Sequence, residues 1–195
     1  MPRPLAVAIT GGIGAGKSEA LGAFRRHGAA TVSSDEIVHR LLREDEDVSR
    51  ELVDRFGDRI LDDVGQIDRG AIAKLVFGDR DQLDWLERLL HPRVAQEYLD
   101  WREQLGRLPN PPNVCVTEVP LLYEVGGDER FDKVVVITAP PEIRAERSQM
   151  AGELREGRLL PDEEKAQRAD FVYVNDGTLD QLDAFVADVM RKLTE

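Results

Sequence analysis

Cysteine is almost absent from this chain, because Cys115 is the only one among 195 residues. A lone cysteine cannot form a disulfide within the chain, which favours a reducing compartment. Cys115 lies in the apolar run Val114–Val116. Its default interpretation is a small buried hydrophobic side chain, and a reactive thiol is the alternative.

Long hydrophobic runs are also missing. The first apolar segment, Leu5–Thr10, is too short to span a bilayer and lacks a signal-type cleavage site. We therefore expect a soluble cytoplasmic protein without a membrane partner. A length of 195 residues allows one full α/β core with an inserted subdomain.

Positive charge is scarce, since 26 Lys and Arg stand against 38 Asp and Glu and the formal net charge is -12. General nucleic-acid binding needs a basic face that displaces counterions from phosphates, so we expect no nucleic-acid partner. A few cationic groups in a cleft can still hold the polyphosphate of a nucleotide. The composition therefore leaves nucleotide chemistry open.

A glycine-rich stretch near the N-terminus carries the strongest motif. Gly11–Ser18 reads GGIGAGKS and satisfies the Walker A pattern GxxxxGK[ST], between a β-prone run and a predicted helix. Backbone N–H groups of such a loop wrap a triphosphate, while Lys17 reaches its β- and γ-phosphates and Ser18 ligates magnesium. A plain glycine-rich turn is the alternative. The predicted ATP-binding residues here are Gly12, Ile13, Gly14, Ala15, Gly16, Lys17, Ser18 and Glu19.

Asp35 stands where a second strand, predicted at Ala29–Val32, gives way to the next helix. One interpretation is an N-cap, because aspartate oxygens accept the unpaired N–H groups of a helix start. The other is a catalytic carboxylate, because ligands of such folds bind beyond the carboxyl ends of the strands. There it would accept the proton of an attacking hydroxyl. The residues alone leave both open.

The region from about Ile37 to Leu105 is predicted to be helical, with apolar residues at helical spacing in segments such as Leu83–Leu90. So many helical residues between two strands imply an insertion that holds an acceptor substrate, or helices that merely pack on the sheet. Pro92 is predicted to end one of these helices. His91 is then a C-terminal cap or a group that contacts substrate.

Three further strands are predicted, in Val114–Glu124, Asp132–Ala139 and Asp170–Asn175. Glu118 is placed like a Walker B acid, which binds magnesium directly or through water; an acid that solvates a loop is the alternative. Asn175 ends the last strand. It is interpreted as a contact to the nucleotide base or as a turn residue.

Four arginines follow the fourth strand. Arg144 and Arg147 lie on a helix predicted to begin at Pro141, and Arg155 and Arg158 lie in a glycine-punctuated polar stretch. A stretch in this position is typical of a lid that brings cations over the phosphates. Solvated surface is the plain alternative for each of them.

These observations predict an α/β P-loop kinase fold: a five-stranded parallel sheet flanked by helices, with a helical substrate-binding insertion and a short lid. We expect a single domain over residues 1–195. Its core comprises residues of about 1–36, 113–141 and 166–195, the acceptor-binding insertion about 37–112, and the lid about 142–165.

The chain resembles the dephospho-coenzyme A kinase family in blocks that follow the family's order over nearly its whole length. A P-loop alone would not identify a substrate, but the HP and PLLYE blocks beside it are more specific. The blocks are Thr10–Ser18, Asp35 in the family's DAD segment, Phe56–Gly57, Gly65–Arg69, Val76–Phe77, Leu89–Val94, Val119–Glu124 and Ala169–Gly177.

The resemblance implies transfer of the γ-phosphoryl group of ATP to the ribose 3′-hydroxyl of dephospho-coenzyme A, with Mg²⁺ as cofactor. ATP and dephospho-coenzyme A are then the partners of a chain expected to be a monomer. Asp35 becomes the catalytic base, and Lys17 neutralises charge in the transition state. The resemblance also implies ATP contacts from Arg147 and Asn175, metal contacts from Ser18 and Glu118, and acceptor contacts from Thr10, Asp35, His91, Leu121, Leu122 and Glu124.

Three features depart from the family's pattern. Ser33 replaces the first acid of the DAD segment, and Glu19 stands where the family usually has threonine. The segment between Arg147 and Pro161 is several residues shorter, and the usual second lid arginine has no clear counterpart.

Two rival functions are weighed against this one. The first is another small-molecule or nucleoside kinase on the same scaffold. The second is a P-loop nucleotide switch, but the comparable segment Val174–Gly177 lacks the lysine of a guanine-reading NKxD motif.

Overall fold

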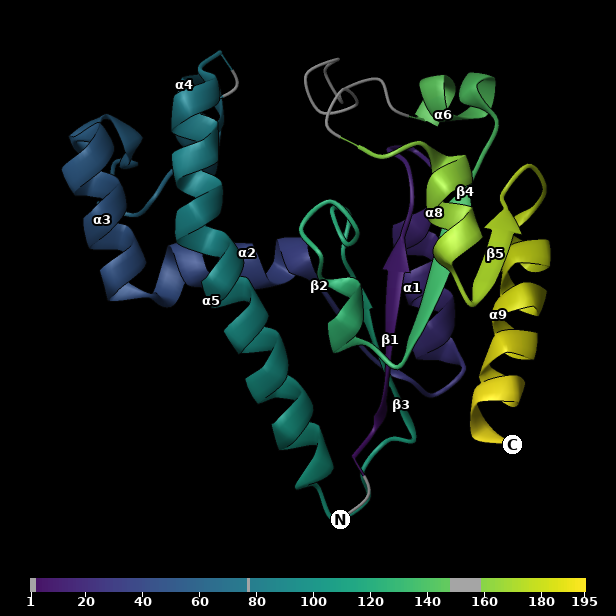
Figure 1. The fold of residues 1–195 in the computed structure, drawn as a ribbon. Coiled ribbons are helices and arrows are strands. Elements are labelled where there is room, and N and C mark those ends of the chain that lie inside the picture. Colours follow the sequence, from purple (N-terminus) through teal and green to yellow (C-terminus); the bar gives the residue numbers. More distant parts are fainter. Residues whose placement is uncertain (1–2, 77, 148–158) are drawn as a thin grey trace. The chain divides into compact units, whose positions relative to one another are not determined.

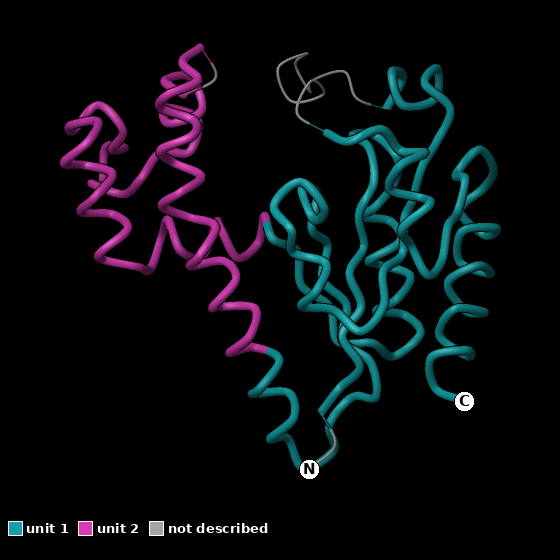
Figure 2. Tube along the Cα trace, in the orientation of Figure 1, with its two compact units in different colours: residues 1–34, 102–195 teal, residues 35–101 magenta. Residues whose placement is uncertain are grey.

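The computed structural model describes residues 3–76, 78–147 and 159–195. The chain divides into two compact units (Figure 2). The core unit comprises residues 1–34 and 102–195, and the helical unit comprises residues 35–101. Each unit contains its own cluster of buried apolar side chains, so each has a hydrophobic core of its own.

A parallel sheet forms the centre of the core unit (Figure 1). Its strands are β1 (Leu5–Thr10), β2 (Ala30–Ser33), β3 (Val114–Glu118), β4 (Lys133–Thr138) and β5 (Phe171–Val174), in the spatial order β2-β3-β1-β4-β5. The middle strand β1 is buried beyond its first residue, as apolar strands are when both faces of a parallel sheet are covered. The predicted five-stranded parallel sheet is confirmed.

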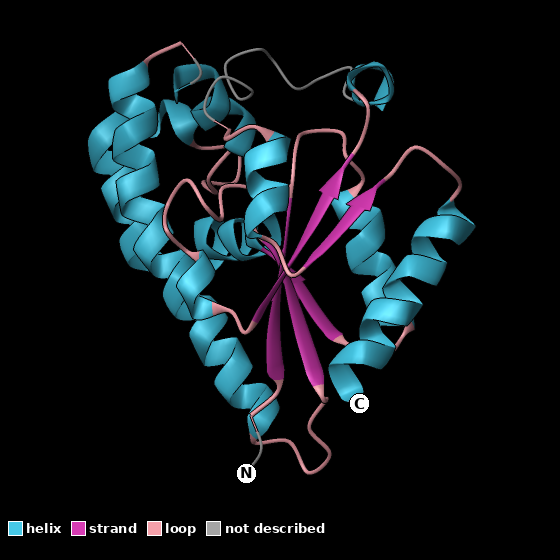
Figure 3. Ribbon diagram, turned by 45° about the vertical axis from the view of Figure 1, so that its right-hand side comes forward, coloured by secondary structure: helices cyan, strands magenta, loops and turns pink. Residues whose placement is uncertain are grey.

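Helices of the core unit are α1 (Lys17–Arg26), α6 (Pro141–Arg147), α8 (Asp162–Arg168) and α9 (Leu179–Thr194), with a short 3₁₀ helix η2 (Asp128–Arg130). The helices α1 and α9 lie side by side against the sheet (Figure 3). Val7 and Ile9 of β1 belong to the cluster that these two helices cover. Ala8 belongs to a second cluster, with Leu122 and Val136. Because successive strand residues point to opposite faces, the two clusters fill the two faces of the sheet.

The helical unit confirms the prediction of a helical region after β2. Its elements are α2 (Ser34–Glu44), α3 (Glu46–Phe56), η1 (Asp58–Ile60), α4 (Arg69–Val76) and α5 (Arg80–Gly106). The first residue of α2 and the last residues of α5 belong to the core unit. Val48, Leu52 and Ile72 are among its buried core residues, and the rings of Phe56 and Trp85 meet edge to face at 5.6 Å. No helix in the described ranges has the length and apolar character needed to cross a bilayer.

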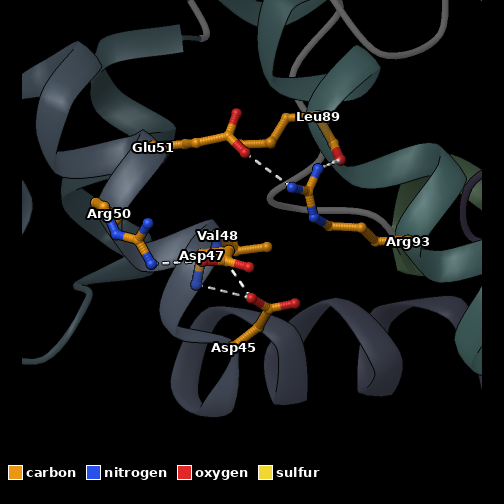
Figure 4. Close-up of polar contacts among 7 residues, drawn as sticks. All are labelled: Asp45, Asp47, Val48, Arg50, Glu51, Leu89 and Arg93. Atoms are coloured by element: carbon orange, nitrogen blue, oxygen red, sulfur yellow. Dashed lines mark hydrogen bonds and ion pairs between the residues drawn. The ribbon is translucent and has the colours of Figure 1, made fainter.

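Pro92 lies inside α5, so the prediction that a helix ends there is wrong. A proline lacks the N–H that would bond to the carbonyl four residues earlier. The carbonyl that loses its helix bond is therefore that of Arg88. Arg93 ties the same turn to its surroundings: its Nη1 donates to the Leu89 carbonyl at 2.8 Å and its Nη2 donates to Glu51 on α3 at 2.8 Å (Figure 4). Leu89 and Leu90 are buried in the helical core. Packing and side-chain contacts thus continue the helix through the proline.

Candidate active site

The carboxyl end of β1 leads into the glycine loop, and α1 begins at Lys17, as the Walker A prediction requires. Gly16 has a left-handed φ of 96°, and a Cβ at this position would lie 2.2 Å from Asn175 Nδ2. Conformation and space therefore both require glycine there. Glu19 is exposed in the first turn of α1, where the helix dipole favours an acid. The free N–H groups of this helix start make the loop a suitable anion site.

Lys17 folds back over the loop. Its Nζ donates to the carbonyl oxygen of Gly12 at 2.8 Å, and the side chain is buried. Burial of an ammonium group is unfavourable unless it is compensated by acceptors or negative charge. Lys17 is therefore held at the loop in a position that favours an anionic ligand.

Ser18 and Glu118 bring a hydroxyl and a carboxylate together, with Ser18 Oγ donating to Glu118 Oε2 at 3.1 Å. The pairing of β3 with β1 explains this contact, because Glu118 stands opposite Ile9, near the end of β1. Oxygen ligands of this kind suit Mg²⁺. The described residues contain no cluster of three or more His, Cys, Asp or Glu that could hold a metal. The pair thus fits a Mg²⁺ ion that takes its other ligands from phosphate and water.

Asn175, which follows β5, holds the P-loop by a side-chain hydrogen bond. Its Nδ2 donates to the Ala15 carbonyl at 2.9 Å, its backbone N–H donates to Thr138 at 2.7 Å, and it is only 4% exposed. The position at the end of β5 was predictable from the sequence. The contact with the loop was not, because it depends on how β5 and the loop meet in space.

Arg147 lies at the end of α6 and is largely exposed. Its Nη1 is 3.5 Å from the carbonyl oxygen of Asn175, which is a long hydrogen bond. Arg147 therefore stands beside the residue that holds the P-loop. Arg155 and Arg158, which sequence analysis assigned to a lid, lie outside the described residues.

Glu124 forms a buried ion pair that sequence analysis missed. Its Oε1 lies 2.8 Å from Lys165 Nζ on α8 and also accepts the N–H of Leu160 at 2.8 Å. The Lys165 side chain is 0% exposed, and the Glu124 side chain is 11% exposed. No sequence signal pointed to Lys165, because a lysine in the run Asp162–Arg168 is typical of a solvated helix face. This pair ties the turn after β3 to α8.

The other acceptor candidates of the core unit surround the same turn. Thr10 Oγ1 donates to the Pro120 carbonyl at 3.2 Å. Leu122 is 0% exposed and packs with Ala8 in the core, whereas Leu121 is only half-buried. Leu121 therefore presents more surface to a ligand than Leu122 does.

Asp35 and His91 belong to the helical unit, and both are exposed. The N-cap interpretation of Asp35 is wrong, because α2 begins at Ser34 and Asp35 lies inside its first turn. The C-cap interpretation of His91 is wrong as well, because α5 continues to Gly106. Since neither Asp35 nor His91 caps a helix and both are exposed, both side chains are available to a ligand.

A parallel sheet whose middle strand runs into a Walker A loop is the framework of a P-loop kinase. Beside that loop, Ser18 and Glu118 supply two oxygen atoms of the kind that bind Mg²⁺. The family model described as Dephospho-CoA kinase matches residues 5–181. The chain belongs to the dephospho-CoA kinase family, which confirms the resemblance and removes the alternative of a nucleotide switch.

Individual relatives agree with this assignment. The chain is similar to the dephospho-CoA kinase of Protochlamydia amoebophila (strain UWE25), with 38% identity over 96% of this chain and 95% of the relative. The dephospho-CoA kinase of Aquifex aeolicus (strain VF5) is 34% identical over 96% and 97% of the two chains. The crystal structure of TT1252 from Thermus thermophilus matches with a TM-score of 0.78 and 33% identity, and covers both chains fully.

Proposed function

We propose that this chain transfers the γ-phosphoryl group of ATP to the 3′-hydroxyl of dephospho-coenzyme A, giving coenzyme A and ADP. The family match over residues 5–181 supports the choice of acceptor. The observation that carries the chemistry is the completed Walker A loop, with Lys17 on the Gly12 carbonyl and Ser18 beside Glu118. This is the arrangement that phosphoryl transfer requires.

On the nucleotide side, the amides of the loop and Lys17 bind the β- and γ-phosphates. Asn175 keeps the loop in shape through Ala15, and Arg147 and Glu19 flank it. Ser18 and Glu118 would hold Mg²⁺, which when bound neutralises part of the polyphosphate charge. Alignment and charge neutralisation then supply most of the catalysis.

On the acceptor side, Asp35 takes the proton of the 3′-hydroxyl as that oxygen forms its bond to the γ-phosphorus. The bond from the γ-phosphorus to the bridging oxygen breaks, and its electron pair leaves with ADP. Lys17 stabilises the charge that develops on the leaving group. Exposure of the Asp35 side chain and its freedom from a capping role support this assignment.

The acceptor site extends over several elements in this proposal. His91 and Leu121 contact dephospho-coenzyme A directly, and Thr10 fixes the turn at Pro120 through its hydroxyl. Leu122 and Glu124 act by holding that turn against the core and α8. The insertion of about residues 37–112 holds the acceptor in this proposal. The lid is expected over about residues 142–165, of which 148–158 lie outside the described residues.

We also propose that the protein works in the cytoplasm as a monomer that binds ATP and dephospho-coenzyme A but neither nucleic acid nor a membrane. The net charge of -12 and the lone buried cysteine support this setting.

A coupled assay of ADP release tests the function. Dephospho-coenzyme A, nucleoside monophosphates and shikimate are offered in parallel, each with ATP and Mg²⁺. We expect turnover with dephospho-coenzyme A to exceed that with the others by orders of magnitude, and the product to carry its new phosphate on the 3′-oxygen. Absence of turnover with dephospho-coenzyme A, or faster turnover of another acceptor, would refute the proposal.

A further inference from the structure

The Walker A pattern requires glycine at Gly11 and Gly16 and allows any residue at the four positions between them. Two of those four positions, Gly12 and Gly14, are also glycine. Gly12 and Gly14 each face Arg144 of α6. A Cβ on Gly12 would lie 2.4 Å from Arg144 Nη1, and a Cβ on Gly14 would lie 2.7 Å from the Arg144 carbonyl oxygen. Arg144 therefore packs directly on the loop, from its backbone to its guanidinium group.

Gly12 thus lies between two cationic side chains. Lys17 Nζ donates to its carbonyl oxygen at 2.8 Å, and the Arg144 guanidinium packs against its α-carbon. Two positive charges directed at the same residue are stabilised by a nearby anion. The surroundings of Gly12 consequently favour negative charge.

Asp162 of α8 supplies one negative charge. Its Oδ2 accepts a hydrogen bond from Thr138 at 2.8 Å and lies 3.7 Å from Arg144 Nη1. A separation of 3.7 Å is an ion pair but too long for a hydrogen bond. In the part of the chain that the structure describes, the buried Nε of Arg144 also has no hydrogen-bond partner. Asp162 therefore attracts Arg144 without using the donors of its guanidinium group.

We propose that Arg144 binds the nucleotide polyphosphate, and that it exchanges Asp162 for a phosphate oxygen when ATP enters the loop. A guanidinium group forms shorter and stronger hydrogen bonds to phosphate than this loose ion pair provides. Asp162 stays bonded to Thr138 and neutralises Arg144 when the loop is empty. Arg144 thereby supplies a second phosphate cation from α6. The inference rests on the proposed use of ATP.

Calorimetric titration with ATP and with AMP, each with Mg²⁺, tests the exchange. Arg144→Gln should weaken ATP binding about tenfold, as expected for loss of a charge-assisted hydrogen bond, and leave AMP binding unchanged. Asp162→Asn should strengthen ATP binding about threefold, because a competing negative charge is gone. The double variant should bind ATP more weakly than Asp162→Asn, because the guanidinium group is gone. Any gain in affinity over Arg144→Gln measures direct repulsion by the Asp162 carboxylate, which also faces Gly12.

Asp128→Asn is the matched control, because Asp128 forms a different ion pair with α8, to Arg168 at 3.0 Å. It should leave ATP affinity unchanged. Thermal unfolding without nucleotide monitors folding of each variant. Equal losses of ATP and AMP affinity in Arg144→Gln would overturn the inference, and so would weaker ATP binding in Asp162→Asn. A wild-type chain that binds no ATP would refute the proposed function as well, whereas unchanged ATP binding by Arg144→Gln would refute this inference alone.

Discussion

Glu124→Ala would leave the buried ammonium group of Lys165 without the carboxylate that compensates its charge. Lys165 is 0% exposed, its Nζ lies 2.8 Å from Glu124 Oε1, and the same oxygen accepts the N–H of Leu160. Removing one partner of a buried ion pair costs about 3–5 kcal/mol. In a chain of this size each kcal/mol lowers the melting temperature by about 2–4 °C. We therefore expect a decrease of about 6–20 °C.

Scanning calorimetry measures this decrease, and a double variant isolates its cause. Glu124→Leu combined with Lys165→Met removes both charges and should recover most of the lost stability, because apolar residues can replace a buried pair at little cost. Glu103→Ala, which removes an exposed partner of Arg107, serves as a control without a measurable effect. If Glu124→Ala melts like the wild type and instead raises the KM for dephospho-coenzyme A, Glu124 is a substrate contact and the reasoning is refuted.

Two further predictions concern Asn175 and Cys115. Asn175→Ala should weaken binding of ATP, GTP and ADP by a similar factor of about 5–150, because the buried Ala15 carbonyl loses its donor at a cost of about 1–3 kcal/mol. Calorimetric titration with the three nucleotides checks this. A loss of affinity confined to the adenine nucleotides would indicate a base contact instead. Burial raises the pKa of the Cys115 thiol to about 11, so only about one molecule in a thousand carries a thiolate at pH 8. Iodoacetamide should therefore label the unfolded chain and spare the folded one, and rapid labelling of the folded chain would contradict this.

The sheet and the P-loop were predictable because their signals are local. Apolar runs bounded by turn residues located all five strands, and the Walker pattern located the loop. The predicted third strand, Val114–Glu124, was too long, because β3 ends at Glu118 and a turn follows it. The contact of Ser18 with Glu118 follows once β3 is paired with β1, since parallel strands bring their carboxyl ends to one edge.

The errors arose where contacts distant in sequence override local rules. Pro92 was expected to end a helix, but Arg93 and the packing of Leu89 and Leu90 continue it. Lys165 and Asp162 look like solvated residues of a charged helix, and only the folded chain brings them to Glu124 and Thr138. Sequence periodicity carries no information about such partners.

Proton acceptance by Asp35 is the step on which the proposed reaction depends most. Single-turnover phosphoryl transfer from ATP to dephospho-coenzyme A is measured for Asp35→Asn, alongside calorimetric ATP binding, with Asp47→Asn in an exposed helix turn as the control. We predict unchanged ATP affinity and a transfer rate lower by at least about a hundredfold, as for loss of a positioned base. Transfer at the wild-type rate by Asp35→Asn would contradict the proposed reaction.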